Sequence, residues 1–418
     1  MSDLPVSDLP VSDLPVPDLP VPDLPVSDRP GTVIDVHTHV FPRIGRDEGR
    51  VLADEEEPWL RVDGGGTGMM MCGDEEYRPV GAALWEPARR LADMDAAGVD
   101  VQAVSSTPLM FGYAAEPSRA ADWCELVNER ILAFCADAPD RLLPLCQVPL
   151  QEPALACDVA TRAAAAGHRG VHIGNHVGDR DLDDEGITAF LAHCARIGLP
   201  VLAHPWDMLG ADRMRGHMLP WLSGMPAETQ LSILGLMLSG AFERIPASLR
   251  LCFCHGGGSF AFLLGRADNA WRRRDVVRAD SPRPPSEYVD RFHVDSAVFD
   301  PRALRLLVDV MGAERVMLGS DYPFPLGEEE PGATIRACPG LDDGERAMLL
   351  GGNAQAFFGR ARAPGRVPAG PAAAGTAPSG TSPAGTSLSG TSLSGTSLSG
   401  TAPIGTSPSE TAPAETAL

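Results

Sequence analysis

The chain has 418 residues, of which 44% are hydrophobic, and it carries a formal net charge of -22 from 34 basic and 56 acidic residues. Every basic residue is arginine, which excludes a Schiff-base lysine, a pyridoxal phosphate lysine, a Walker lysine and a carbamylated lysine that bridges two metals. An acidic chain without a basic cluster argues against binding to nucleic acid or to an anionic membrane.

The nine cysteines are odd in number and show no C-x-x-C spacing, which indicates buried thiols in a reducing compartment. No uninterrupted apolar run reaches the roughly 18 residues of a membrane span. The N-terminus is acidic and proline-rich, unlike a signal peptide. The sequence therefore predicts a cytoplasmic protein.

Both ends of the chain have a biased composition. Residues 1–30 repeat a five-residue unit, Ser/Pro-Asp-Leu-Pro-Val, and residues 361–418 consist mainly of Ala, Pro, Gly, Ser and Thr. Neither segment has the apolar residues to form a core, so we predict that both are disordered. Residues 31–360 are predicted to form one domain of the α/β-barrel size class.

Between these ends, strand and helix patterns alternate, and each short apolar run is followed by a turn or helix signal. Several expected helices begin with an acidic residue and proline and end before glycine. Eight such units predict a (β/α)8 TIM-like barrel. The expected strands are 33–40, 100–106, 142–149, 169–174, 199–205, 249–255, 291–297 and 315–320. The expected helices are 86–98, 116–137, 152–166, 184–197, 228–244, 260–274, 300–312 and 342–358.

The segment 41–85, after the first strand, is too long for an ordinary connection in such a barrel. We predict that it is a lid insertion that covers the mouth of the barrel. Its glycine-rich run, Gly64 to Gly68, lacks the lysine and the following helix of a phosphate loop. This run is therefore expected to be a hairpin or hinge within the lid.

Candidate metal ligands occupy the ends of several expected strands. His37 and His39 lie at i and i+2 in one strand and therefore on the same face. His204, His255 and Asp321 each follow another apolar run, and strand ends converge at the C-terminal face of a barrel. Three imidazoles, a carboxylate and a water suit catalytic Zn²⁺. His255 is either a further ligand or the base that deprotonates the water, and we favour the base.

Several stretches resemble the amidohydrolase superfamily and, within it, the branch of metal-dependent decarboxylases. The resemblance covers about residues 33–360, and the stretch around Trp221 and the run after Asp321 are more specific than the metal motif alone. The matching stretches are Ile34 to His39, Met94 to Val104, His204 to Met208, Leu219 to Thr229, His255 to Phe260 and Gly319 to Glu328.

This resemblance implies a non-oxidative, zinc-bound hydroxide decarboxylation of an aminocarboxymuconate semialdehyde in kynurenine-type catabolism, with no organic cofactor. It implies one zinc ion per chain and activation of the bound water by His255. It also implies that Arg78, in the lid, and Arg266 bind the carboxylates of a small dicarboxylate substrate. Arg266 would act in the site of the neighbouring subunit, which requires a homodimer. The implied zinc ligands are His37, His39, His204 and Asp321, and the implied pocket-lining residues are Trp221, Met208 and Phe324.

The sequence departs from the family pattern at one place. Cys72 stands where the family commonly has a second basic group before Arg78, and this difference concerns the substrate and not the metal site. The fourth expected strand is followed by Gly174, Asn175 and His176 and supplies no bridging acid, which favours one metal over two.

Three alternatives stay open at this point. The first is a relative that decarboxylates another unsaturated or aromatic carboxylate. The second is a lactone or amide hydrolase that uses the same zinc hydroxide. The third, disfavoured by the complete set of ligand types, is a non-catalytic barrel.

The remaining polar residues are given structural roles. Asp35 is expected to orient a ligand or its strand without being a ligand. His176 and Asp295 could support a ligand, but satisfied polar residues are the favoured interpretation. The histidines left as structural are His168, His172, His193, His217 and His293.

Overall fold

The computed structural model describes residues 31–52 and 57–359. Both segments that were predicted to be disordered, 1–30 and 361–418, lie outside the described residues.

A single sheet of eight parallel strands forms the centre of the fold, and the strands follow one another in chain order. This is the order of a (β/α)8 barrel, so the predicted fold class is confirmed. The strands are β1 (Ile34–Val40), β5 (Val101–Ser106), β6 (Leu142–Cys146), β7 (Gly170–Gly174), β10 (Val201–His204), β11 (Leu251–Phe253), β12 (His293–Asp295) and β13 (Val316–Met317).

Backbone hydrogen bonds between β1 and the segment after β13 join the first strand to the last. The amide of Val36 donates to the carbonyl of Leu318 at 2.9 Å, and the amide of His39 donates to the carbonyl of Tyr322 at 2.8 Å. Thr38 pairs with Tyr322 in a parallel bridge. These contacts close the barrel and leave no free edge on β1.

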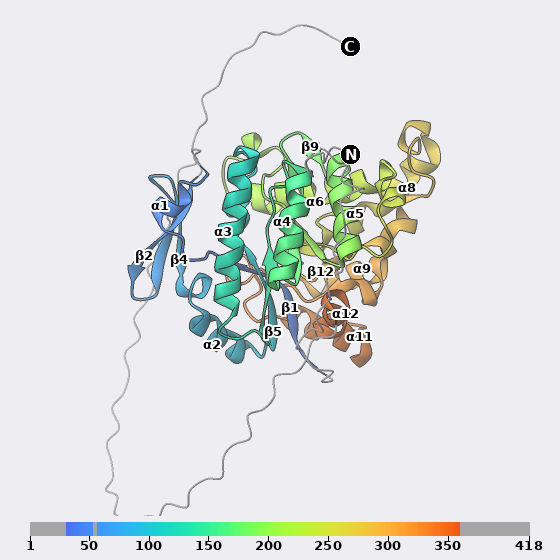
Figure 1. Ribbon diagram of the computed structural model, residues 1–418. Coiled ribbons are helices and arrows are strands. Elements are labelled where there is room, and N and C mark those ends of the chain that lie inside the picture. The colour runs from blue at the N-terminus through green and yellow to red at the C-terminus, as the bar shows by residue number, and fades with distance from the viewer. Residues whose placement is uncertain (1–30, 53–56, 360–418) are drawn as a thin grey trace, which may run out of the picture. The chain divides into compact units, whose positions relative to one another are not determined.

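Helices follow the strands and pack around the outside of the barrel, as Figure 1 shows for α3, α4 and α5. Proline at the first position of α2, α3, α4 and α9 matches the helix starts predicted from the sequence. None of the helices in the described part of the chain is long and apolar enough to cross a membrane. The main helices are α2 (Pro87–Ala97), α3 (Pro117–Cys135), α4 (Pro153–Ala166), α5 (Glu185–Ile197), α6 (Met225–Leu238), α8 (Phe260–Arg273) and α9 (Pro301–Met311).

Several expected elements differ from those observed, and the strand expected at 315–320 is shortened to β13, Val316–Met317. The helix expected at 228–244 is divided into α6 and α7 (Ala241–Arg244), because Gly240 adopts a φ of 70° at the break. The helix expected at 342–358 is interrupted by a π-helical turn, η11 (Met348–Gly352), which separates α11 (Asp343–Ala347) from α12 (Asn353–Phe358). The strand expected at 142–149 ends at residue 146.

The insertion after β1 forms a separate antiparallel sheet of β2 (Pro58–Gly64), β3 (Thr67–Cys72) and β4 (Glu75–Gly81). Figure 1 shows this sheet, in blue, beside the ring of barrel helices, together with the short α1 (Arg46–Gly49). The glycine-rich run is the turn of the β2–β3 hairpin, so the prediction of a hairpin is confirmed. That the insertion acts as a lid stays a prediction.

Apolar side chains fill the barrel interior below the strand ends. Ile34 and Val36 of β1 pack with Leu202 of β10 and with Phe357 of α12, and all are buried. This layer supports the polar side chains above it and separates them from solvent at the N-terminal end of the barrel.

The turn between β11 and α8 depends on the absence of a side chain at Gly258. This residue has a φ of 64°, and a Cβ atom there would lie 2.2 Å from the carbonyl oxygen of Pro226. We expect Gly258→Ala to lower the free energy of unfolding by more than about 2 kcal/mol, measured by urea denaturation.

Gly265→Ala is the matched control, because Gly265 lies in α8 and a Cβ atom there would meet nothing within 4 Å. Alanine should leave stability unchanged or raise it by up to about 1 kcal/mol. Equal urea midpoints for the two variants would contradict this account of the turn.

Candidate metal centre

Three imidazoles and one carboxylate converge at the C-terminal ends of the barrel strands. His37 and His39 come from β1, His204 ends β10, and Asp321 lies in the segment after β13. Their nearest ligand atoms all lie within 4.8 Å of one another. The Nε2 atoms of His37 and His39 are 3.1 Å apart, and Nε2 of His39 is 3.1 Å from Oδ1 of Asp321. Ligands about 2 Å from one ion have separations of this size.

Hydrogen bonds at the Nδ1 atoms fix the orientation of all three rings. Nδ1 of His37 donates to Asp295 at 2.7 Å, and Nδ1 of His204 donates to the Pro205 carbonyl at 2.6 Å. Nδ1 of His39 donates to the Ser106 carbonyl at 3.2 Å. In the neutral form of each ring, Nδ1 then carries the proton and the Nε2 lone pair is left for a cation. The donor set therefore fits a divalent transition metal.

Burial and the neighbouring charges set the protonation states of the cluster. Burial lowers the pKa of His204 well below its usual range, and repulsion from His255 and His37 adds to this. Burial also lowers the pKa of His39. Burial favours the neutral form of Asp321, but its contacts with His255 and His39 hold its pKa well below the usual range. Neutral imidazoles beside an ionised carboxylate are the forms that bind a metal.

His37 differs from the other two imidazoles. Burial favours its neutral form, but Cys254 and the Asp295 carboxylate raise its pKa well above the usual range. A metal bound at its Nε2 would therefore displace a proton.

His255 lies against the cluster, with its ring centroid 4.9 Å from that of His37 and 4.8 Å from that of His204. Its Nε2 is 3.9 Å from Oδ2 of Asp321, and no hydrogen bond to either ring nitrogen is formed within the described residues. The backbone of His255 has a φ of 56°, a strained conformation that occurs at functional sites. This imidazole is free to exchange a proton with a molecule in the site.

Asp295 connects this imidazole to the cluster. Asp295 accepts the hydrogen bond from Nδ1 of His37. It also accepts hydrogen bonds from the amides of His255 at 3.0 Å and Gly256 at 2.8 Å. The expectation that Asp295 is only a satisfied polar residue is therefore incomplete, because it contacts a member of the cluster. Its position at the end of β12 was visible in the sequence, but its partner depends on a contact across the barrel.

Asp35 has the orienting role that was predicted. It accepts hydrogen bonds from the amide of Ser320 at 3.1 Å and from the Ser320 hydroxyl at 2.5 Å. It also accepts a bond from the amide of His37 at 3.2 Å. Asp35 thus ties β1 to the residue before Asp321 without contributing to the cluster.

His172 was expected to be structural, but it packs directly against the cluster. Its ring centroid is 5.7 Å from that of His39 and 5.5 Å from that of His204. It is buried, and no hydrogen bond to either ring nitrogen is formed within the described residues. Strand alternation was the signal in the sequence. Gly174 pairs with His204, and His172 lies two residues before Gly174, so both point to the same face of the sheet.

His176 does not reach the cluster. Its ring nitrogens bond to the carbonyls of Gly178 at 3.0 Å and Asp207 at 3.1 Å, in line with the satisfied polar residue that was favoured.

One aromatic residue, Phe324, contacts the cluster, and an arginine from the insertion lies over its ring. The ring of Phe324 is 5.3 Å from that of His39. The guanidinium carbon of Arg78, on β4, is 5.4 Å from the centre of the Phe324 ring and 5.8 Å from that of Trp221. The insertion therefore brings its arginine to Phe324, which contacts the cluster. No carboxylate pairs with Arg78 within the described residues.

The other two residues assigned to the substrate pocket are Met208 and Arg266. Met208 packs against Gly224, where a Cβ atom would lie 3.0 Å from that of Met208. Arg266 is exposed on α8, and among the described residues no contact joins it to the cluster.

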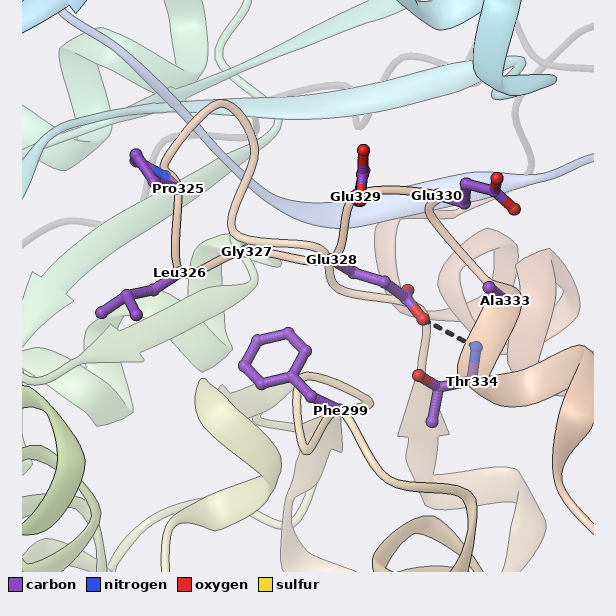
Figure 2. Close-up of a pocket in the computed structure, with 9 residues that line it drawn as sticks. All are labelled: Phe299, Pro325, Leu326, Gly327, Glu328, Glu329, Glu330, Ala333 and Thr334. Atoms are coloured by element: carbon purple, nitrogen blue, oxygen red, sulfur yellow. Dashed lines mark hydrogen bonds between the residues drawn. The ribbon is translucent and has the colours of Figure 1, made fainter. Parts of the chain in front are cut away.

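An open hollow lies in the loop after Asp321, and Figure 2 shows its lining. Glu328 accepts hydrogen bonds from the amides of Gly332 and Thr334, each at 2.7 Å, and so holds this loop. Glu329 and Glu330 add further negative charge, and none of the cluster residues lines the hollow. Its acidic lining makes it unsuitable for an anion.

Comparison with known proteins bears on this centre. A 2-amino-3-carboxymuconate-6-semialdehyde decarboxylase from Dictyostelium discoideum is 37% identical over 332 residues, which cover 78% of this chain and 91% of the relative. An enzyme of the same name from Caenorhabditis elegans is 30% identical over 77% of this chain and 92% of its own length. The crystal structure of 5-carboxyvanillate decarboxylase from Sphingomonas paucimobilis matches with a TM-score of 0.66 and 25% identity, covering 78% of this chain and 99% of that one.

The amidohydrolase family model matches residues 34–360, a range that begins at β1 and runs past α12. The match thus contains the whole barrel, the insertion after β1 and every residue of the cluster. The chain belongs to the amidohydrolase family.

Proposed function

We propose that this chain is a carboxy-lyase that converts 2-amino-3-carboxymuconate-6-semialdehyde to 2-aminomuconate-6-semialdehyde and CO2. The reaction is non-oxidative, depends on one Zn²⁺ per chain and belongs to kynurenine-type tryptophan catabolism. The proposed ligands are His37, His39, His204 and Asp321, with His255 as the catalytic acid and base.

The observation that carries this proposal is the cluster itself, in a chain that matches a decarboxylase of this substrate over 91% of that relative's length. One nitrogen from each of three imidazoles and one carboxylate oxygen lie within 4.8 Å of one another, and an imidazole without a hydrogen-bond partner in the described chain lies beside them. A bound divalent ion at such a site supplies a Lewis acid and lowers the pKa of water that it holds.

The charge and position of Arg78 support the proposal that the substrate is an anion. A carboxylate that approaches a chain with a net charge of -22 needs a local cation, and a guanidinium group binds a carboxylate through two parallel hydrogen bonds. Arg78 lacks a carboxylate partner within the described residues and lies over the aromatic rings of Trp221 and Phe324. In this proposal, Arg78 holds a substrate carboxylate while the two rings exclude water.

His255 has the proton-transfer role. In the net reaction the bond between carbon and the departing carboxylate breaks, CO2 leaves, and a proton takes its place on carbon. Nε2 of His255 lies 3.9 Å from Oδ2 of Asp321 and can take a proton from water and return it to the product carbon. Arg266, exposed on α8, would serve the site of a second copy in a homodimer.

A second candidate is the decarboxylation of an aromatic carboxylate. The observation that favours it is Cys72 on β3, in place of a second basic group, together with the similarity to a gamma-resorcylate decarboxylase from Rhodococcus jostii, 29% identical over 56% of this chain. One guanidinium suits a monocarboxylate better than a dicarboxylate.

The activity test uses purified full-length chain with Zn²⁺ and follows the loss of substrate absorbance together with CO2 release. We expect turnover that a chelator abolishes. His255→Ala should lower kcat by at least about 100-fold, because it removes the proton-transfer group. Metal content, measured by elemental analysis, should stay at one ion per chain.

Turnover by the variant at the wild-type rate would remove His255 from the mechanism. If the wild-type chain binds one metal ion but shows no turnover, the proposed substrate is excluded. Aromatic carboxylates and lactones would then be tested. Reconstitution with Mn²⁺, Fe²⁺ and Co²⁺ compares the alternative metals.

Asp295→Asn tests the orientation of His37. Asparagine keeps an acceptor for one amide but removes the charge that holds the proton on Nδ1 of His37. We expect metal affinity to fall by about 10- to 100-fold, measured by competition with a chromophoric chelator. Asp300→Asn is the control, since Asp300 is an exposed helix cap at the start of α9. Equal affinity in both variants would contradict a supporting role for Asp295.

Arg78→Met tests the carboxylate contact. Methionine keeps much of the packing against Trp221 and Phe324 but removes the charge, so KM should rise by at least about 10-fold because the charged hydrogen bond is lost. Arg61→Met, in strand β2 of the same sheet, is the control, because Arg61 pairs with Asp63 and Glu76 on the surface. An unchanged KM in steady-state kinetics would exclude Arg78 from substrate binding.

A further inference from the structure

A charged group lies behind the metal centre, on the outer side of β1. Arg90, on α2, is fully buried. Its Nη1 donates to the Thr38 hydroxyl at 3.0 Å and to Oε1 of Gln102 at 2.9 Å, and its Nη2 donates to the carbonyl of His39. No carboxylate forms an ion pair with it in the described part of the chain. Burying the Arg90 charge among neutral acceptors alone costs free energy of folding. A role at this position would explain why the charge is there.

The contacts of Arg90 converge on one of the segments that carry ligands. Thr38 lies between His37 and His39 in β1, and its side chain points away from the cluster because side chains alternate along a strand. The hydroxyl of Thr38 also donates to the carbonyl of Ala103 at 2.6 Å. Arg90 thus holds β1 from behind, through a side chain and a backbone carbonyl at successive residues.

The same guanidinium also reaches the segment that carries Asp321. Its central carbon is 4.9 Å from the centre of the Tyr322 ring, a cation–π distance. The Tyr322 hydroxyl donates to Asp93 at 2.7 Å, and Asp93 is also on α2. Helix α2 therefore holds Tyr322 at both its ring and its hydroxyl.

Asp321 needs such support because its backbone is strained. It has a φ of 63° without being glycine, and such conformations persist only where the surroundings fix them. Its amide donates to the carbonyl of His37 at 2.9 Å, so any shift of β1 against this segment would change the distances between the ligand atoms.

We propose that Arg90 is a positioning residue for the metal centre, which locks β1 and the Asp321–Tyr322 segment in the register that brings His39 and Asp321 together. Arg90 does not touch the cluster side chains and acts through Thr38, the His39 carbonyl and Tyr322. This inference rests on the proposed function, because it requires that the cluster binds a metal.

The test compares Arg90→Lys with Arg250→Lys in the full-length chain. Lysine keeps the charge but cannot reach several acceptors in a fixed fork. Arg250 is the matched control, because it also donates to backbone carbonyls, those of Phe357 and Gly198, and lies just before β11, away from the cluster. For each protein, the dissociation constant for Zn²⁺ and the melting temperature of the metal-free form are measured. The absorption spectrum of the Co²⁺ form reports the ligand geometry.

We expect Arg90→Lys to weaken Zn²⁺ binding by at least about 10-fold and to change the Co²⁺ spectrum. Arg250→Lys should lower only the melting temperature of the metal-free form. Wild-type Zn²⁺ affinity and an unchanged Co²⁺ spectrum in Arg90→Lys would overturn the inference, even if the protein were less stable. Failure of the wild-type chain to bind Zn²⁺ or Co²⁺ would instead overturn the proposed function.

Thr38→Val keeps the test decisive if Arg90→Lys does not fold. Valine matches the shape of threonine but removes the acceptor for Nη1 of Arg90. We expect weaker Zn²⁺ binding and a changed Co²⁺ spectrum in this variant as well. A Thr38→Val protein with the wild-type dissociation constant and spectrum would overturn the proposed coupling.

Discussion

The closure of the barrel is the constraint on which the centre depends. The amide of Asp321 donates to the carbonyl of His37, and the amide of His39 donates to the carbonyl of Tyr322. These bonds set the last strand segment against the first in one register. A slip of one residue would turn the side chains of β1 to the other face and remove both histidines from the interior. The same hydrogen bonds that close the sheet therefore assemble the cluster.

The centre concentrates polar groups that would be unfavourable elsewhere in a core. Three imidazoles lie within ring contact of one another, and burial keeps two of them neutral. His255 and Asp321 both have positive φ values, each costing about 1–3 kcal/mol. Asp295 and Asp35 offset part of this cost, because they accept amide hydrogen bonds from the strained segments or from their neighbours. Carboxylates that are not proposed ligands thus contribute to the stability of the site.

Much of this arrangement could be read from the sequence. Alternation in β1 and the placement of His204 and Asp321 after apolar runs were enough to predict one cluster in a barrel, because strand ends meet at one face. The contact of Asp295 with His37 and the packing of His172 were missed, since both depend on distances across the barrel that no local pattern encodes. The break at Gly240 was missed because the surrounding residues favour helix, and a single glycine does not always end one.

The proposed metal ligands and the proposed substrate contact come from different parts of the fold, the barrel and the insertion. The proposed ligands come from strands and their ends, where register fixes position, whereas Arg78 comes from a separate sheet. In a chain without lysine, arginine is the side chain that carries a permanent positive charge, and its planar guanidinium can stack on aromatic rings as well as bind carboxylates. Arg78 lies over Trp221 and Phe324, from two other parts of the chain. The aromatic rings thus contact the proposed anion-binding group from outside the insertion. A change in β3, where Cys72 lies, would therefore act on the proposed substrate contacts and not on the ligand atoms of the cluster.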